Sequence, residues 1–331
     1  MHDGLVIDMF AGGGGASEGI REALGREVDI AVNHDLKALM MHAMNHPDAL
    51  HLKEDVFNVK LEEYTRGRHV SLMWASPDCT HFSRARGGKP RSQHIRMLPW
   101  AVYEQSRNIL PDVVVCENVA EIQTWEDYEN FVGSMRSLGY TFESRELCAA
   151  DYGARTSRTR WYAVFRRDGC ATAWPEQSNA RAGTLQETMI PRWMPAYGVI
   201  DFSNVGENVN HKRKPLSEKT KARLRRGFAK WGDHWLMTYY GTGTGQPLDE
   251  PLRTITCNDH FALVTTQYDG IHMRMLTPEE LKLAQGFPRE YIIDRYSDGT
   301  RVTRAEQVRR IGNSVVPIMA RHIVAANVDA A

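Results

Sequence analysis

Continuous apolar runs alternate with helix-like stretches through the first half of the chain. Runs of this length without polar interruption are typical of strands buried on both faces of a parallel sheet, and they lie at residues 4–10, 69–75 and 111–116. Helices are predicted at 16–24 and 36–45. The alternation continues to about residue 167 and predicts an α/β fold with a doubly wound, mostly parallel sheet.

The pattern changes after Cys170. Residues 171 to about 270 contain scattered prolines and tryptophans, with short strands predicted at 252–256 and 261–266. This stretch predicts a smaller, irregular second domain.

A cysteine and a glutamate follow two of the predicted strands. Cys79 comes just after the run at 69–75, and Glu117 directly follows the run at 111–116. Most free cysteines are small buried hydrophobes, so Cys79 alone would be read in that way. Because the carboxyl ends of parallel strands meet at one edge of a sheet, we expect a nucleophile and an acid to share one crevice.

The first predicted strand ends at a run of four glycines. A strand, a glycine turn and a helix form a nucleotide-type pocket. The spacing of Asp8, Gly12 and Gly14 differs from a dinucleotide fingerprint, because Ser17 stands where the third glycine belongs. An acid at the strand end suits the cationic amino-acid end of S-adenosylmethionine better than a pyrophosphate.

These segments resemble the DNA (cytosine-5) methyltransferase family, and further motifs follow in the family's order. The matching segments are Asp8 to Gly15, Ser76-Pro77-Asp78-Cys79 with Phe82-Ser83, Glu117-Asn118-Val119, Arg158-Thr159-Arg160, Thr277 through Gln285-Gly286-Phe287-Pro288, and Gly312-Asn313-Ser314-Val315. The resemblance covers nearly everything outside residues 170–250. It implies a fold of the class I methyltransferase type.

The resemblance also implies a division of the chain and of its tasks. Residues 1–170 would form the catalytic and cofactor-binding domain, 171–270 the target-recognition domain, and 271–331 a return segment completing the catalytic domain. By resemblance Cys79 is the thiolate that adds to cytosine C6, and Glu117 is the acid at N3. Arg160, with Arg158 nearby, would bind the O2 side of the base. Such chemistry requires the cytosine to be flipped out of the duplex.

The cofactor implied by the resemblance is S-adenosyl-L-methionine. The residues expected to bind it are Asp8, Phe10, Gly12, Gly14, Gly15, Asn33, Asp55, Asn313 and Ser314. Asn33 stands where the family usually has an acid for the ribose hydroxyls, and Asp35 is the competing candidate. Asp35 has an equally plausible alternative role as the cap of the helix at 36–45.

Double-stranded DNA is the expected partner, although the chain has 41 basic and 41 acidic residues and so no net charge. The stretch 211–230 is strongly basic and suits phosphate contact, with a solvated helix face as the alternative. The DNA-binding residues expected from this stretch and from the resemblance are Ser83, Arg84, Lys89, Arg223, Arg225, Arg226 and Thr254.

These observations predict a DNA (cytosine-5-)-methyltransferase that acts through a covalent Cys79–C6 intermediate. A tRNA cytosine-5 methyltransferase and an inactive DNA-binding homologue are the alternatives. The five cysteines form no C-x-x-C pair, so we expect no metal site and a reducing, cytoplasmic setting of bacterial, phage or prophage type. We expect a monomer without membrane contact, and a partner restriction endonuclease is left open.

Overall fold

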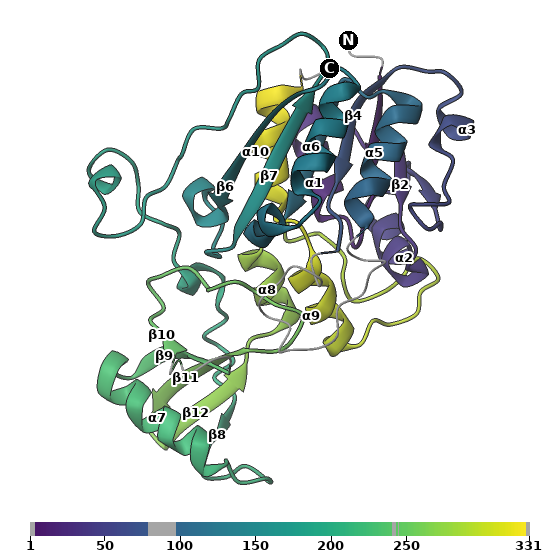
Figure 1. Cartoon of the computed structure of the whole chain (residues 1–331). Helices are drawn as coiled ribbons and strands as arrows, with labels where there is room; N and C mark the ends of the chain where they lie inside the picture. The colour runs from purple at the N-terminus through teal and green to yellow at the C-terminus, as the bar shows by residue number, and fades with distance from the viewer. Residues whose placement is uncertain (1–3, 79–96, 240–242, 244, 329–331) are drawn as a thin grey trace.

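The computed structural model describes residues 4–78, 97–239, 243 and 245–328. A seven-stranded sheet has the order β3-β2-β1-β4-β5-β7-β6 (Figure 1). Its strands are β1 (Leu5–Asp8), β2 (Ile30–Val32), β3 (Leu50–Leu52), β4 (Val70–Ala75), β5 (Val113–Asn118), β6 (Thr141–Cys148) and β7 (Thr159–Arg166). All neighbouring pairs from β3 to β5 are parallel, whereas β7 is antiparallel to both β5 and β6. The predicted α/β fold with a mostly parallel sheet is therefore confirmed.

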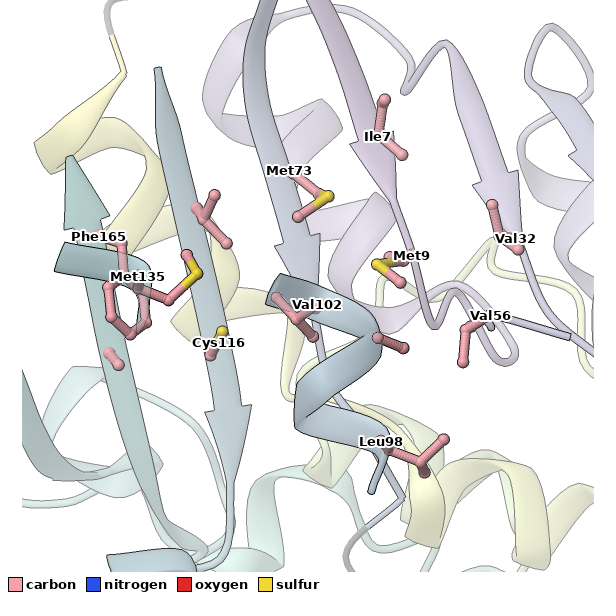
Figure 2. Packing of buried hydrophobic residues seen from close by; sticks show 14 of the residues in the cluster. Ile7, Met9, Val32, Val56, Met73, Leu98, Val102, Cys116, Met135 and Phe165 are labelled. Carbon is pink, nitrogen blue, oxygen red and sulfur yellow. The ribbon is translucent and has the colours of Figure 1, made fainter. Parts of the chain in front are cut away.

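Helices cover both faces of this sheet. The residues of β1 alternate between two cores, because Val6 packs on one side while Leu5 and Ile7 pack on the other. The core around Val6 lies under α1 (Gly15–Leu24) and α10 (Pro317–Asn327). The opposite core lies under α3 (Leu61–Thr65), α5 (Leu98–Ile109) and α6 (Tyr128–Ser137), and Figure 2 shows side chains of α5 meeting those of β1 and β4 there.

A second sheet forms a separate layer below the first in Figure 1. Its strand order is β10-β9-β11-β12-β8, and every pair is antiparallel. The strands are β8 (Glu207–Asn208), β9 (His234–Thr238), β10 (Gly245–Gln246), β11 (Phe261–Gln267) and β12 (Gly270–Met275). The remaining helices are α2 (Leu36–Asn45), α7 (Glu218–Trp231), α8 (Pro278–Ala284) and α9 (Arg304–Asn313), with short 3₁₀ turns at Ala120–Thr124, Ala149–Tyr152, Leu185–Thr188 and Ala196–Val199.

The two faces of the second sheet are buried by different helices. Leu224 of α7 packs with Trp235, Met237 and Val264 on one face. Leu236 and Leu263, on the other face, share a core with residues of α8 and α9. The second sheet thus lies between α7 on one face and α8 and α9 on the other.

Most predicted elements are present, with one exception. The prediction of a strand at 252–256 is wrong, because Leu252 makes only an isolated bridge to Thr156. The chain at Leu252 is held by Ser157, whose backbone N–H donates to its carbonyl at 2.7 Å. Domain boundaries at 170 and 270 stay a prediction, although the second sheet extends from Glu207 to Met275.

Candidate active site

The predicted site residues converge because of strand order. Strands β1, β4 and β5 are adjacent and parallel, so the segments after Asp8, Ala75 and Asn118 leave the same edge of the sheet. Strand β7 is antiparallel to β5, so it begins at this edge. Four features therefore lie at one edge of the sheet: the glycine loop, the segment leading to Cys79, Glu117 and Arg160. The sequence predicted this meeting for Glu117 and the segment leading to Cys79.

Glu117 and Arg160 form an ion pair at this edge. The Nε atom of Arg160 lies 3.3 Å from Oε1 of Glu117, and both side chains are largely buried. The pairing follows from register, because Glu117 lies opposite Tyr162 on β7, two residues from Arg160. A guanidinium beside a carboxyl group in a shielded crevice can orient it toward a polar ligand.

Asn118 fixes the segment that leads to the predicted nucleophile. Its Nδ2 donates to the carbonyl of Pro77 at 3.1 Å, and its own Oδ1 accepts from the N–H of Val119 at 2.8 Å. The strand β5 therefore holds the exit of β4. Predictions for Cys79, Ser83, Arg84 and Lys89 fall outside the residues that the structure describes.

Arg158 has a different environment from Arg160. Its side chain is buried, and Nη1 donates to the carbonyls of Ile255 at 3.1 Å and Gly312 at 3.2 Å. These contacts tie β7 to the segment before β11 and to the end of α9. Arg158 therefore has a structural role that the sequence did not indicate. Its assistance at the base stays a prediction.

Cys257 is a residue of this region that the sequence analysis did not select. Its Sγ donates to Oδ1 of Asn313 at 2.7 Å. The backbones are also close here, because an added Cβ at Gly312 would lie 2.2 Å from the backbone of Thr256. Burial raises the pKa of the Cys257 thiol, Arg158 opposes this, and Asp78 adds to it. The segment carrying Cys257 and the half-buried Thr254 therefore lies against the predicted closing motif.

The four glycines of the loop differ in how tightly they are packed, and Gly13 would make only ordinary van der Waals contacts through an added Cβ. At Gly12, with φ of +52°, an added Cβ would meet only the carbonyl of Phe10, at 3.7 Å. At Gly14 it would lie 2.1 Å from the hydroxyl of Tyr291, and at Gly15 1.9 Å from Oγ of Ser314. Gly14 and Gly15 are thus required by protein packing, whereas Gly12 and the half-buried Phe10 leave room beside the strand end.

Asp8 is fully buried at the end of β1. Ser17 donates to its Oδ2 at 2.8 Å, and Oγ of Ser17 also lies 2.9 Å from Nε2 of His42. Burial raises the pKa of Asp8 to about 6, although the Ser17 hydroxyl and the Phe10 backbone N–H oppose the shift. The carboxyl is therefore directed into the protein, and its role toward a cofactor stays a prediction.

Comparison with known proteins identifies the family of this site. A family model described as C-5 cytosine-specific DNA methylase matches residues 5–328. The chain belongs to the C-5 cytosine-specific DNA methylase family. The match includes both sheets and the return through α9 and α10, so the methylase fold comprises all described elements.

Individual relatives are similar over nearly the whole chain. A type II methyltransferase from Haemophilus parahaemolyticus, M1.HphI, is 25% identical over 97% of this chain and 85% of its own length. A type II methyltransferase from Escherichia coli, M.Eco47II, is 27% identical over 94% of this chain and 75% of its own length. The solved structure of the Entamoeba histolytica methyltransferase EhMeth has a TM-score of 0.67 at 15% identity and covers 98% of each chain, which shows a shared fold.

The two candidates for ribose binding make different contacts within the protein. Asp35 caps α2 by accepting from the backbone N–H of Lys37 and Ala38, and it accepts from Arg310 at 2.7 Å. The predicted capping role of Asp35 is confirmed. Asn33 accepts from the N–H of Asp35 through Oδ1 and is half-buried, and Oδ1 of Asp55 accepts from the N–H of Phe57. Contact of Asn33 or Asp55 with a cofactor stays a prediction.

Residues 218–230 of the basic stretch lie in α7, on the face of the second sheet opposite to α8 and α9. Arg225 and Arg226 are exposed there, while Arg223 lies over the ring of Tyr239 at 5.7 Å. The structure therefore does not bring these arginines together with Glu117. Their predicted contact with DNA would have to occur away from Glu117 and Arg160.

The described ranges contain neither a candidate metal-ion cluster nor a membrane-spanning helix. Within them, no group of three or more His, Cys, Asp or Glu side chains is arranged to hold a metal ion. Across the same part of the chain, no helix has the length and apolar character needed to cross a membrane.

Proposed function

We propose that this methylase transfers a methyl group from S-adenosylmethionine to C5 of a flipped-out cytosine in duplex DNA. The observation that carries the proposal is the Glu117–Arg160 pair, at 3.3 Å, beside the segment that leads to Cys79. Cytosine C5 is a weak nucleophile, so the ring needs a thiolate at C6 and neutralisation of charge at N3. Cys79 and Glu117 are the residues of this chain suited to those tasks.

The residues near the glycine loop fit the cofactor. Gly12 is open where Gly14 and Gly15 are packed, Phe10 is half-buried beside it, and Asn33 follows the neighbouring strand. An aromatic ring, an open backbone turn and an amide suit an adenine, an amino-acid group and a ribose. When bound, the cofactor supplies an electrophilic methyl group.

The protein's own residues would act as follows. The Glu117 carboxyl group would hydrogen-bond N3 and the 4-amino group, Arg160 would hold Glu117 and the O2 side of the base, and Cys79 would form the bond to C6. After C5 takes the methyl group, loss of the C5 proton and elimination of Cys79 would restore aromaticity and free the enzyme. Asn118, which binds the Pro77 carbonyl, would position the segment before the nucleophile.

Trapping the covalent intermediate tests the proposal. The protein is incubated with S-adenosylmethionine and duplex DNA containing 5-fluorocytosine, because fluorine at C5 blocks the final elimination. We expect a DNA adduct that resists denaturing electrophoresis and maps to Cys79. Cys79→Ala should abolish it, and Glu117→Gln should slow its formation by several orders of magnitude.

Two controls separate the alternatives. S-adenosylmethionine binding by the wild-type protein, measured by calorimetry, distinguishes an inactive homologue from an enzyme given the wrong polymer. With cofactor binding established, absence of an adduct on DNA of varied sequence would contradict the proposal, and methylation of tRNA instead would replace the substrate.

A further inference from the structure

A buried tyrosine–histidine pair lies directly behind the glycine loop. The hydroxyl of Tyr291 donates to the carbonyl of Gly13 at 2.7 Å and lies 3.3 Å from Nε2 of His46. A Cβ at position 14 would be 2.1 Å from that hydroxyl and 3.0 Å from Nε2 of His46. The loop is therefore seated against these two side chains, which have no part in the mechanism above.

Both ring nitrogens of His46 make contacts inside the protein. Its Nδ1 lies 2.6 Å from Oε2 of Glu27, a carboxylate that can only accept. The hydroxyl proton of Tyr291 goes to the Gly13 carbonyl, and the same oxygen lies 3.3 Å from Nε2 of His46. Glu18, 3.8 Å from Nε2, adds a second negative charge beside this fully buried ring.

The position of Tyr291 is set by elements other than the glycine loop. The buried Nζ of Lys282, on α8, donates to the Tyr291 carbonyl at 2.9 Å. Asn45, at the end of α2, exchanges two hydrogen bonds with the backbone of Ile292, at 2.9 and 2.7 Å. The hydroxyl is thus a fixed point to which the loop attaches.

We propose that Tyr291 and His46 are positioning residues for cofactor binding, which hold the Gly13 peptide so that Gly12 stays open toward the ligand. This inference rests on the proposed use of S-adenosylmethionine. Gly12 and Gly14 have φ of +52° and +95°, a region that glycine enters at little cost and leaves as easily. Fixing the Gly13 carbonyl removes conformations that the loop would otherwise lose when ligand binds.

A pair of tyrosine variants tests the proposal. Tyr291→Phe removes the hydroxyl and keeps the ring that packs on Phe287. Tyr140→Phe is the matched control, because the buried Tyr140 also donates to a backbone carbonyl at 2.7 Å, that of Pro111, at the far end of β5. Calorimetry with S-adenosylmethionine and with S-adenosylhomocysteine gives the affinity of each protein, and thermal unfolding gives its stability.

We expect both variants to lose similar stability, but only Tyr291→Phe to bind either ligand about five- to tenfold more weakly, as for one lost hydrogen bond. In turnover, KM for S-adenosylmethionine should rise by the same factor with kcat nearly unchanged. Equal affinities for Tyr291→Phe and the wild type would overturn the proposal. Failure of the wild type itself to bind would instead contradict the proposed function.

A double-mutant cycle tests whether His46 acts through Tyr291. Glu27→Gln weakens the support of the histidine ring without removing it, and should lower cofactor affinity by about two- to threefold. Added to Tyr291→Phe, it should cause no further loss, because its route to the loop has already been removed. A fully multiplicative loss in the double variant would show that Glu27 and His46 do not act through the tyrosine.

Discussion

At the scale of single residues, Asp8 has the environment with the most direct consequence. The sequence predicts it as an acid at a strand end that faces a cationic ligand. The structure places it in full burial, with the Ser17 hydroxyl on its carboxylate. The burial of Asp8 was not predictable from its position at a strand end. It depends on Ser17 of α1, which contacts Asp8, and on His42 of α2, which contacts Ser17. An ionised Asp8, which a cationic ligand would need, therefore lowers the stability of the folded protein.

The raised pKa of Asp8 makes that cost dependent on pH. Because the folded pKa is about 6 and the ordinary value is 3.8, the folded state binds more protons than the unfolded state between these values. Stability contributed by the protonated group is present below the ordinary pKa and is lost as pH rises through the folded pKa. From pH 5 to pH 8 this loss amounts to about 1 kcal/mol for this group.

Asp8→Asn removes the titrating group and keeps an oxygen for Ser17. Without cofactor, the stability of the variant relative to the wild type should increase by about 1 kcal/mol from pH 5 to pH 8, as measured by urea unfolding. A stability difference that does not vary with pH would mean that Asp8 keeps an ordinary pKa in the folded protein.

At the scale of elements, the packing of α1 depends on a glycine whose position in the sequence carries no signal. Gly19 lies in the middle of α1, where glycine is unfavourable by roughly 1 kcal/mol relative to alanine. An added Cβ there would be 2.1 Å from the carbonyl of Pro317 and 2.7 Å from Cβ of Ala320. The close contact of α1 with α10 therefore outweighs helix propensity at this position.

Alanine at two helical glycines should have opposite effects. Gly19→Ala should destabilise the protein by about 1–3 kcal/mol, because the packed backbone of α10 cannot move aside. Gly133→Ala, in α6, should stabilise it by up to about 1 kcal/mol, because an added Cβ meets no atom within 4 Å. Chemical unfolding of both variants gives the comparison, and a stabilising Gly19→Ala would contradict the packing of α1 on α10.

At the scale of the whole molecule, long-range contacts join the two sheets near the edge that carries Glu117 and Arg160. Arg158 links β7 to the segment before β11 and to α9, and Cys257 reaches Asn313. Helix α7 packs on the opposite face of the second sheet from α9, which takes part in these contacts. If its exposed arginines bind DNA, they contact phosphates away from the target base.

Neutralising Arg225 and Arg226 together, each to Gln, should weaken DNA binding and reduce the slope of log affinity against log salt by about two. The control is Arg66→Gln with Arg68→Gln, which removes equal charge from exposed residues. These residues precede β4 and so lie at the edge of the large sheet opposite to Glu117. Binding is measured by fluorescence anisotropy over a range of salt concentrations. An unchanged slope in the α7 variant would make this helix a solvated surface only.

The sequence by itself determined the order of elements, the mostly parallel sheet and the segments that meet at its carboxyl edge. These follow from apolar runs and strand polarity, which are local properties. Glu117 was predicted for the same reason, because it follows a recognisable strand, whereas Arg160 was predicted from the resemblance to the family.

Only the tertiary structure decided the burial of Asp8, the attachment of the Gly13 carbonyl to Tyr291, the tie made by Arg158 and the placement of α7 away from the crevice. Each depends on contacts between segments far apart in the chain. Gly13 and Tyr291, for example, are 278 residues apart. No local pattern encodes which hydroxyl, carbonyl or guanidinium will meet when the layers pack, because that is set by the summed packing of the whole fold.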